Sequence, residues 1–283
     1  MRIILLGTGG PRPDPMRMGP STLVNIGSDN LVFDAGRGVA TRLVQAGVSI
    51  TDYGHVFITH LHFDHTGGLA DLLFASWNKA RNKTIHVYGP KGTEAMVANL
   101  FKAYEKDIWY RLSETMLTHE KLIDIREMVK VHDVDPGLVC FGSGWKVIAM
   151  DVDHGHGLGL SREEWGCLAY RVESEDRSIV ISGDAVWSPS LTNFAYGSDV
   201  LVMCCYLSGD EIVDHDTELI SKYVLASSLE AGKIASEAEV KKIVLVHIRE
   251  KPQKLLDVMV DEIQRDFTGE VIIGEDLLEI KVK

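Results

Sequence analysis

The chain has 283 residues, and 45% of them are hydrophobic, which is enough to bury a sizeable core. Acidic residues outnumber basic ones, 41 to 29, for a net charge of −12. This balance argues against a general binder of phosphate backbones, because such proteins need clustered Lys and Arg. The four cysteines form no CxxC pair, which indicates reduced, buried thiols in a cytoplasmic protein. The first apolar run ends at Gly7, too early for a signal-peptide core or a membrane span.

The first half of the chain predicts short strands followed by helices. Four prolines exclude regular structure from residues 10–20, so this segment is expected to be a surface loop bordering a site. Residues 39–46 and 68–77 suit helices, the second with an apolar face. Residues 91–130 are expected to be largely helical. The strands predicted in this half cover residues 2–6, 21–26, 30–36, 55–59 and 84–90.

The second half repeats this alternation. A long helix is expected at 216–238, and Pro252 is expected to open another. The predicted strands cover residues 144–155, 165–173, 177–184, 198–205, 241–247, 269–274 and 277–283. Strands and helices in two similar halves predict a single α/β domain over residues 1–283, built as a four-layer αββα sandwich.

One stretch carries a dense set of metal-ligand types: THLHFDHTGG, residues 59–68. His60, His62 and Asp64 recur at every second position, and His65 follows directly. They come just after an apolar strand, where a loop can point several side chains into one cleft. Three imidazoles and a carboxylate suit zinc, and also iron or manganese. Chance placement of this set at a strand end is improbable, so we interpret it as a metal site.

Three later strands also end on a ligand type. These strand ends carry His154 in VDHG, Asp184 in SGD and His247 in LVH. Strand ends that meet at one edge of a sandwich converge on one cleft, so these residues are expected to complete the site. His156 competes with His154, but His154 directly follows its strand and is preferred.

In this order, HLHFDH, VDHG, SGD and LVH resemble the metallo-β-lactamase-fold hydrolases over nearly the whole chain. LLGTGGPRP, FDAGRG and THLHFDHTGGL are especially similar to the branch that holds ribonuclease Z and the zinc arylsulfatases. The resemblance implies that one metal ion is held by His60, His62 and His154, and a second by Asp64, His65 and His247. Asp184 would bridge the two ions, which would be zinc, with manganese and iron as alternatives. Asp34, in FDAG, would be either a ligand-orienting residue or a turn aspartate.

Two such ions can share a hydroxide that attacks an ester. The resemblance therefore implies a dinuclear metal-dependent hydrolase of small esters, with phosphodiesters or aryl sulfates favoured. Carboxylic ester or lactone hydrolysis, tRNA 3′ processing and a non-catalytic, metal-binding regulatory role remain alternatives. β-Lactam hydrolysis is disfavoured because no secretory signal is found.

The chain departs from ribonuclease Z in the pair that protonates the leaving group. That family has a His-Glu pair where this sequence has Leu225 and Cys204. The candidate catalytic residues are therefore Asp64, among the ligands, and His215, which either replaces the missing acid or is a surface histidine.

The partners expected from the sequence follow from the same resemblance. The residues from Thr93 to Val139 lack the Gly-Pro cluster and basic run of the tRNA-gripping arm. With the net charge of −12, this predicts that a small ester, and not a nucleic acid, is the principal partner. No membrane partner is expected, and the resemblance implies a homodimer.

Overall fold

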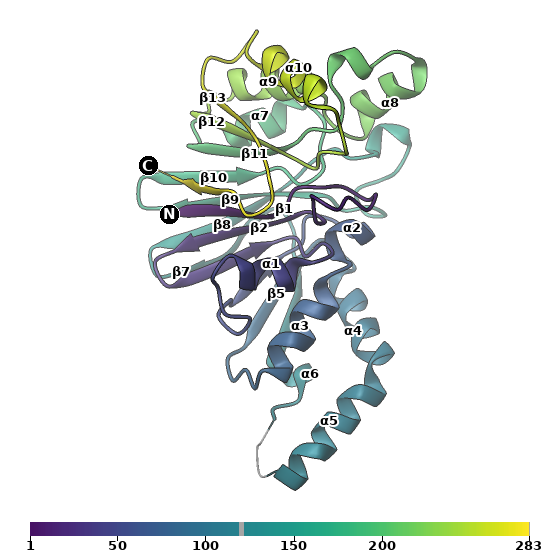
Figure 1. Ribbon diagram of the computed structural model, residues 1–283, viewed down its shortest axis with the longest axis vertical. Helices are drawn as coiled ribbons and strands as arrows, with labels where there is room; N and C mark the ends of the chain where they lie inside the picture. Colours follow the sequence, from purple (N-terminus) through teal and green to yellow (C-terminus); the bar gives the residue numbers. More distant parts are fainter. Residues whose placement is uncertain (119–121, 283) are drawn as a thin grey trace.

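Two seven-stranded sheets face each other in the computed structural model, which describes residues 1–118 and 122–282 (Figure 1). The first sheet has the order β14-β1-β2-β3-β4-β5-β6. Its strands are β1 (Arg2–Gly7), β2 (Ser21–Ile26), β3 (Asp29–Phe33), β4 (His55–Phe57), β5 (Ile85–Gly89), β6 (Val129–Asp133) and β14 (Glu279–Lys281). The second sheet has the order β13-β12-β11-β10-β9-β8-β7. Its strands are β7 (Gly137–Gly142), β8 (Trp145–Asp151), β9 (Leu168–Ser174), β10 (Arg177–Ile181), β11 (Val200–Cys204), β12 (Lys242–Val246) and β13 (Glu270–Ile273).

Helices cover the outer face of each sheet. The first sheet is covered by α1 (Val39–Gln45), α3 (Leu69–Asn78), α4 (Thr93–Ala103) and α6 (Ile125–Met128), whose apolar residues pack in one core. The second is covered by α7 (Pro189–Ala195), α9 (Ser228–Glu237) and α10 (Gln253–Ile263), which pack in another. A third core lies between the sheets, where the ring centroids of Phe33 and Tyr170 are 5.7 Å apart. The four-layer αββα sandwich is thus confirmed, and three cores separate its four layers.

The strand directions explain why the predicted site residues meet. In the first sheet, β3, β4, β5 and β6 run parallel, and in the second, β10, β11, β12 and β13 do so. Such strands are buried on both faces, which is why a run such as VLVMC, in β11, is apolar and buried throughout. Parallel strands all end at the same edge of their sheet, so the loops that follow them are neighbours.

The prediction of one long helix at 216–238 is wrong. The segment forms two helices, α8 (His215–Tyr223) and α9, separated by residues 224–227. Ser227 caps α9 in a reciprocal capping box with Glu230, and the Ala226 amide donates a hydrogen bond to the Ala185 carbonyl. The pattern S-x-x-E marks a helix start, so the break was present in the sequence as a capping signal. Strands β6 and β7 were not predicted either: the expected helical segment covered the first residues of β6, and no element was predicted between residues 131 and 143.

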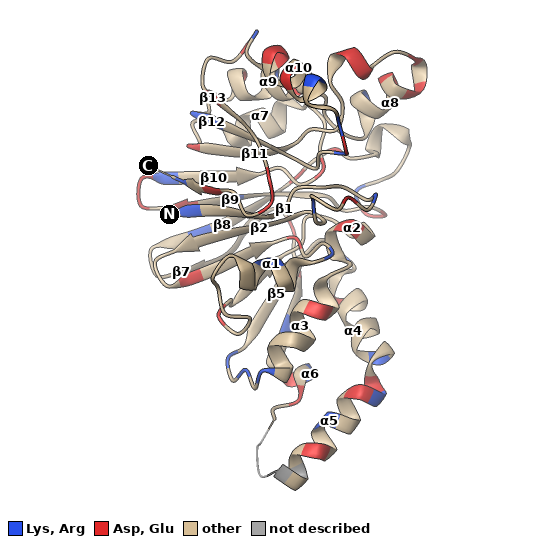
Figure 2. Cartoon of the chain, viewed as in Figure 1, with Lys and Arg blue, Asp and Glu red and all other residues tan. Residues whose placement is uncertain are grey.

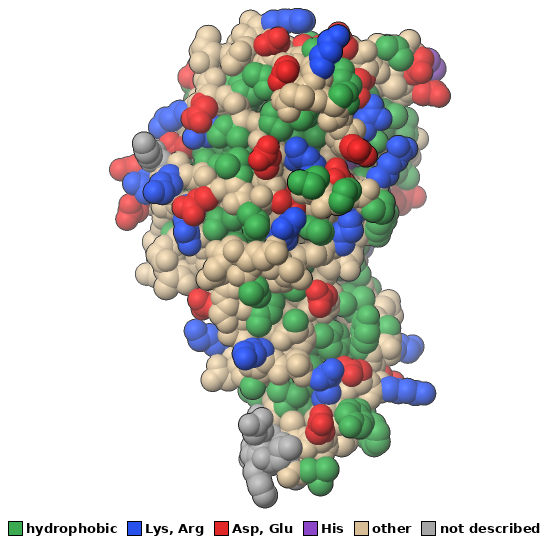
Figure 3. All heavy atoms as spheres, in the orientation of Figure 1, with side chains coloured by type: hydrophobic (Ala, Val, Ile, Leu, Met, Phe, Trp, Pro, Cys, Tyr) green, Lys and Arg blue, Asp and Glu red, His purple; other side chains and the backbone are tan. Residues whose placement is uncertain are grey.

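An extension of the first half projects from the body of the sandwich. Residues 93–118 are helical, as expected, but α5 (Glu105–Thr118) points away from the sheets (Figure 1). Among the residues of α5 whose side chains the structure describes, Ile108 is buried in the core and Leu112 packs against it, whereas Trp109 and Leu117 are 68% and 83% exposed. Figure 3 shows hydrophobic and charged side chains mixed on this narrow part. The mixed charges predicted a solvated face correctly, but not the apolar side chains exposed beside it.

All four cysteines are free thiols, as the sequence predicted, but they differ in burial. Cys167, Cys204 and Cys205 are buried, whereas Cys140 is only half-buried. Within residues 1–118 and 122–282, every helix is too short or too polar to cross a bilayer.

Removing the cap of α9 is expected to weaken the fold. Ser227→Ala deletes the oxygen that accepts the Glu230 amide hydrogen bond, which costs about 1 kcal/mol of unfolding free energy. Urea denaturation followed by circular dichroism measures this loss. Ser28→Ala, in the exposed turn between β2 and β3, is the control. An unchanged midpoint for Ser227→Ala would contradict the capping role.

Candidate metal centre

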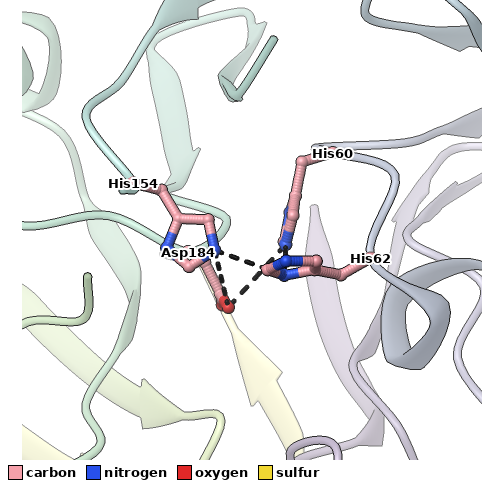
Figure 4. A group of neighbouring side chains, drawn as sticks. All are labelled: His60, His62, His154 and Asp184. Carbon is pink, nitrogen blue, oxygen red and sulfur yellow. Dashed lines mark hydrogen bonds and ion pairs between the residues drawn. The ribbon is translucent and has the colours of Figure 1, made fainter. Parts of the chain in front are cut away.

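Three histidines and one aspartate meet at the shared edge of the two sheets (Figure 4). His60 and His62 lie between β4 and α2 (Phe63–Thr66), His154 follows β8 and Asp184 follows β10. His62 Nδ1 lies 2.9 Å from His60 Nε2 and 3.3 Å from His154 Nε2. Asp184 Oδ2 lies 3.8 Å from His60 Nε2 and 3.9 Å from His154 Nε2. One ligand atom of each residue therefore faces a common point, although the four residues come from both sheets.

A second group lies on the other side of Asp184. It consists of Asp64 and His65 on α2 and His247 after β12. His247 Nε2 lies 3.3 Å from both Asp64 Oδ2 and Asp184 Oδ2. His65 Nε2 lies 3.4 Å from Asp184 Oδ1. The Asp184 carboxylate thus stands between the two groups, and the structure brings together all seven residues that the sequence predicted as ligands.

The far side of several imidazole rings is held by hydrogen bonds. His65 Nδ1 contacts Asp34 Oδ2 at 2.8 Å, and His154 Nδ1 donates to the Val224 carbonyl at 2.6 Å. Asp34 also accepts hydrogen bonds from the Thr59 amide and hydroxyl. A proton fixed on Nδ1 leaves Nε2 free to bind a metal ion. The break between α8 and α9 therefore has a role here, since it exposes the Val224 carbonyl.

The charges of the centre suit a divalent cation. Burial, with the neighbouring His65, lowers the pKa of His60 well below its ordinary value, so this ring is neutral. Burial alone would raise the pKa of Asp184, but His247 and His65 together hold it well below its ordinary value, so the carboxylate is ionised. Neutral imidazole and ionised carboxylate are the forms that ligate metals.

Unpaired buried atoms test this fit further. Among the described residues, His65 Nε2 and Asp184 Oδ1 are buried without a hydrogen-bond partner. Leaving such atoms unpaired is costly, and a bound cation would satisfy both. The residues therefore fit two divalent ions, and the donor set of imidazole and carboxylate is one that zinc accepts.

Two features shape the approach to the centre. A side chain at Gly10 would place its Cβ 2.9 Å from His247 Cε1, so only glycine allows the loop after β1 to lie against this ring. Beside the other ligand group, the ring centroids of Trp165 and His62 are 4.7 Å apart. His156 accepts a hydrogen bond from the His154 amide and donates one to the Trp165 carbonyl. His154 was preferred over His156 as the ligand, and in the structure His156 links His154 to Trp165.

Other residues singled out in the sequence lie apart from the seven. His215 begins α8 with a side chain 78% exposed, and its ionic partner is Glu218 at 3.8 Å. Leu225 and Cys204 are buried in the core beneath α9. The Cys204 thiol contacts the Ala185 backbone, and burial raises its pKa to about 12. An apolar side chain and a neutral thiol thus fill the positions of the His-Glu pair.

Comparisons with known proteins match this fold and site. The family model described as Anti-Pycsar protein Apyc1 matches residues 1–259. Ribonuclease Z of Mycobacterium bovis is 32% identical over 294 residues, which cover 100% of this chain and 98% of the relative. The metallo-β-lactamase-fold protein YhfI from Bacillus subtilis has a TM-score of 0.74 at 21% identity and covers 99% of this chain and 98% of its own. Human tRNase Z, short form, has the same TM-score and identity over 100% of both chains. At 21% identity, the two solved structures show the fold alone.

Fold and site together define a metallo-β-lactamase-fold hydrolase of the ribonuclease Z-like class, a metal-dependent enzyme acting on ester bonds. Within that class, the chain belongs to the family described as Anti-Pycsar protein Apyc1. The mycobacterial relatives carry the name ribonuclease Z.

The expectation that a nucleic acid is not the principal partner is contradicted by these comparisons, because the curated relatives are named ribonuclease Z. The net charge of −12 misled because it is summed over the whole surface, whereas a substrate meets only the local field. Basic residues lie on the loop after β1, next to α2 (Figure 2), where the Arg37 guanidinium donates to the Gly10 carbonyl.

Weakening the hydrogen bond behind His65 is expected to reduce metal affinity. Asn is tolerated at the Asp34 φ of 59°, so Asp34→Asn keeps the backbone but replaces an ionised acceptor with an amide. Zinc affinity should fall roughly 10- to 100-fold, measured by competition with a chromophoric chelator. Asp71→Asn, at an exposed position of α3, is the control. Equal zinc affinity in wild type and Asp34→Asn would show that Asp34 does not orient His65.

Proposed function

We propose that this protein is a dinuclear metal-dependent phosphodiesterase that cleaves phosphodiester bonds of RNA. One observation carries the proposal: the two ligand groups share the Asp184 carboxylate, whose oxygens lie 3.3–3.9 Å from four imidazole nitrogens. The name ribonuclease Z of relatives matched along the whole chain supports RNA as the substrate. Aryl sulfates, favoured from the sequence alone, have no corresponding support.

The roles of the ligand residues follow from their positions. His60, His62 and His154 would hold one ion, Asp64, His65 and His247 the other, and Asp184 both. Two ions bound here would polarise the phosphoryl oxygens and make water nucleophilic at neutral pH. Zinc is our first choice of metal, because the donors are histidine and carboxylate.

The protein's own groups would orient the reaction. Asp34 and the Val224 carbonyl hold His65 and His154 with Nε2 toward the substrate side. The Asp64 and Asp184 carboxylates, both 4% exposed, can accept hydrogen bonds from a water held between them. The Trp165 ring covers one side of the His62 ring, which is otherwise exposed. Together these contacts fix the geometry before the substrate arrives, which is where most of the rate enhancement in such sites originates.

The absent His-Glu pair gives a specific reason for a second candidate substrate. Leu225 and Cys204 cannot protonate a leaving group, and His215 is exposed with its nearest charge on Glu218. A small phosphodiester with a good leaving group needs no such acid. Phosphodiesters of this kind are therefore the second candidate, and His215 as the acid remains a prediction.

Metal-loaded protein should cleave an RNA that carries a 3′ extension, and His62→Ala should not. His62 supplies one of the three imidazoles of the first group, so its loss should lower the rate at least 100-fold. Gel analysis of a tRNA precursor, with zinc or manganese, measures this. Hydrolysis of bis(p-nitrophenyl) phosphate, aryl sulfates and lactones is measured in parallel. Metal binding without turnover of any substrate would favour a non-catalytic role.

Turnover should depend steeply on the leaving group. With Leu225 and Cys204 in place of an acid, the departing oxygen must leave as the anion, so each rise in leaving-group pKa should slow the reaction. A series of aryl methyl phosphates measures this slope. Leu225→Ala adds no acid, so the slope of rate against leaving-group pKa should stay the same. Leu225→His should make that slope shallower if the introduced imidazole reaches the substrate. A flat slope in the wild type would reveal an acid elsewhere in the centre.

A further inference from the structure

A small pocket adjoins the metal centre on the side of the loop after β1. It has a volume of about 220 Å³ and is lined by residues 10–14, Tyr206 and residues 248–250. Pockets for drug-sized ligands are roughly 300–1,000 Å³, so this pocket has room for a single ring system and not for a whole nucleotide.

The pocket is continuous with the second ligand group. Gly10 lies directly against the His247 ring, and the Tyr206 ring centroid is 6.2 Å from that of His247. The Arg37 guanidinium donates to the carbonyls of Gly10 and Arg12 at 3.0 and 2.7 Å. The Ile248 amide donates to the Thr8 carbonyl. These bonds fix the two walls, so a group in the pocket would lie immediately beside a phosphate at the metal centre.

An aromatic platform forms one wall. The Arg249 guanidinium lies over the Tyr206 ring, 5.3 Å from its centroid. Arg249 is held there by an ion pair with Glu211, which Lys251 shares. Burial would raise the pKa of Glu211, but Lys251, the Ser208 amide and Arg249 lower it to about 2, so the ion pair persists at neutral pH. Tyrosine rings and guanidinium planes are surfaces on which unpaired bases stack.

The charges of the other lining residues favour a nucleobase over a phosphate as the ligand of this pocket. Arg12 and Arg249 contribute donors, while Asp14 and Glu250 contribute acceptors, so the pocket carries no excess of positive charge. Pro11, Pro13 and Ile248 add apolar surface. A phosphate would require net positive charge, whereas a nucleobase has both donor and acceptor edges and two apolar faces.

We propose that this pocket binds the nucleobase of the nucleotide next to the scissile phosphate, stacked on the Tyr206–Arg249 pair. This assignment rests on the proposed phosphodiesterase function and adds a specificity element to it. It makes the base, and not only the phosphodiester, part of what the enzyme recognises.

The test compares three substrates with the same leaving group. Uridine 5′-(p-nitrophenyl phosphate) and its 3′ isomer carry a base, and methyl p-nitrophenyl phosphate does not. We expect the zinc enzyme to prefer a uridine ester in kcat/KM. Tyr206→Leu should reduce that preference roughly 5- to 150-fold, since base–aromatic stacking contributes about 1–3 kcal/mol. Tyr206→Phe should retain most of the preference.

The controls separate loss of stacking from damage to the metal centre. Zinc content is measured for every variant, because Tyr206 lies near His247. Arg249→Lys keeps the charge opposite Glu211 but removes the guanidinium plane, so it should also reduce the preference. Tyr110→Leu, at a 59% exposed position of α5, is the matched aromatic control and should not. An equal loss of kcat/KM for the uridine and methyl substrates in Tyr206→Leu would overturn the proposal.

A failure of the proposed function would look different. If the wild type hydrolyses none of these substrates, the pocket is tested by calorimetry with uridine 5′-monophosphate and ribose 5-phosphate. Tighter binding of the nucleotide, lost in Tyr206→Leu, would support the base pocket without any turnover. Equal binding of the two ligands would contradict it.

Discussion

The carboxylate of Asp184 is the constraint on which the rest of the site depends. It belongs to the second sheet, yet its oxygens lie within 3.8 Å of His60 and His65, which follow a strand of the first sheet. That proximity requires both sheets to end at the same edge and in register across the inter-sheet core. The packed rings of Phe33 and Tyr170, and the Tyr170 hydroxyl bonded to the Ile58 carbonyl, hold the sheets in that relation. The geometry of the metal centre therefore depends on the fold, because the core between the sheets sets the spacing of the ligands.

Much of this could be predicted from the sequence for a definable physical reason. The ligands lie on the segments that follow apolar strands, and such strands can be recognised in the sequence by their composition. The groups that support the ligands, namely Asp34, Thr59 and the Val224 carbonyl, were harder to predict. A supporting hydrogen bond leaves no regular spacing in the sequence. The break at residues 224–227 was readable as a capping box, but an otherwise helical composition obscured it. The projection of α5 was not predictable, because amphipathic periodicity does not say whether the apolar face has a partner.

The net charge of the chain misled the prediction of a partner, whereas the replacement of the His-Glu pair could be identified from single residues. The net charge of −12 is a property of the whole surface, whereas a partner meets only the local field, so it led to a wrong inference about the partner. The replacement of the His-Glu pair was visible residue by residue, and the structure gives it a physical meaning. Leu225 and Cys204 lie in one core, so the two positions that would have formed a proton relay instead add to the packing beneath α9.

The contact between Gly10 and the His247 ring has a thermodynamic consequence. This imidazole is a candidate ligand of the second ion, and it lies against Gly10, which lines the neighbouring pocket. Any shift of the ring on loading the ion would therefore move the wall that the substrate meets. The two binding events are then linked, and each must change the affinity of the other by the same factor. Because Gly10 has no side chain, the pocket and the second ion site can lie close enough for binding at one to affect binding at the other.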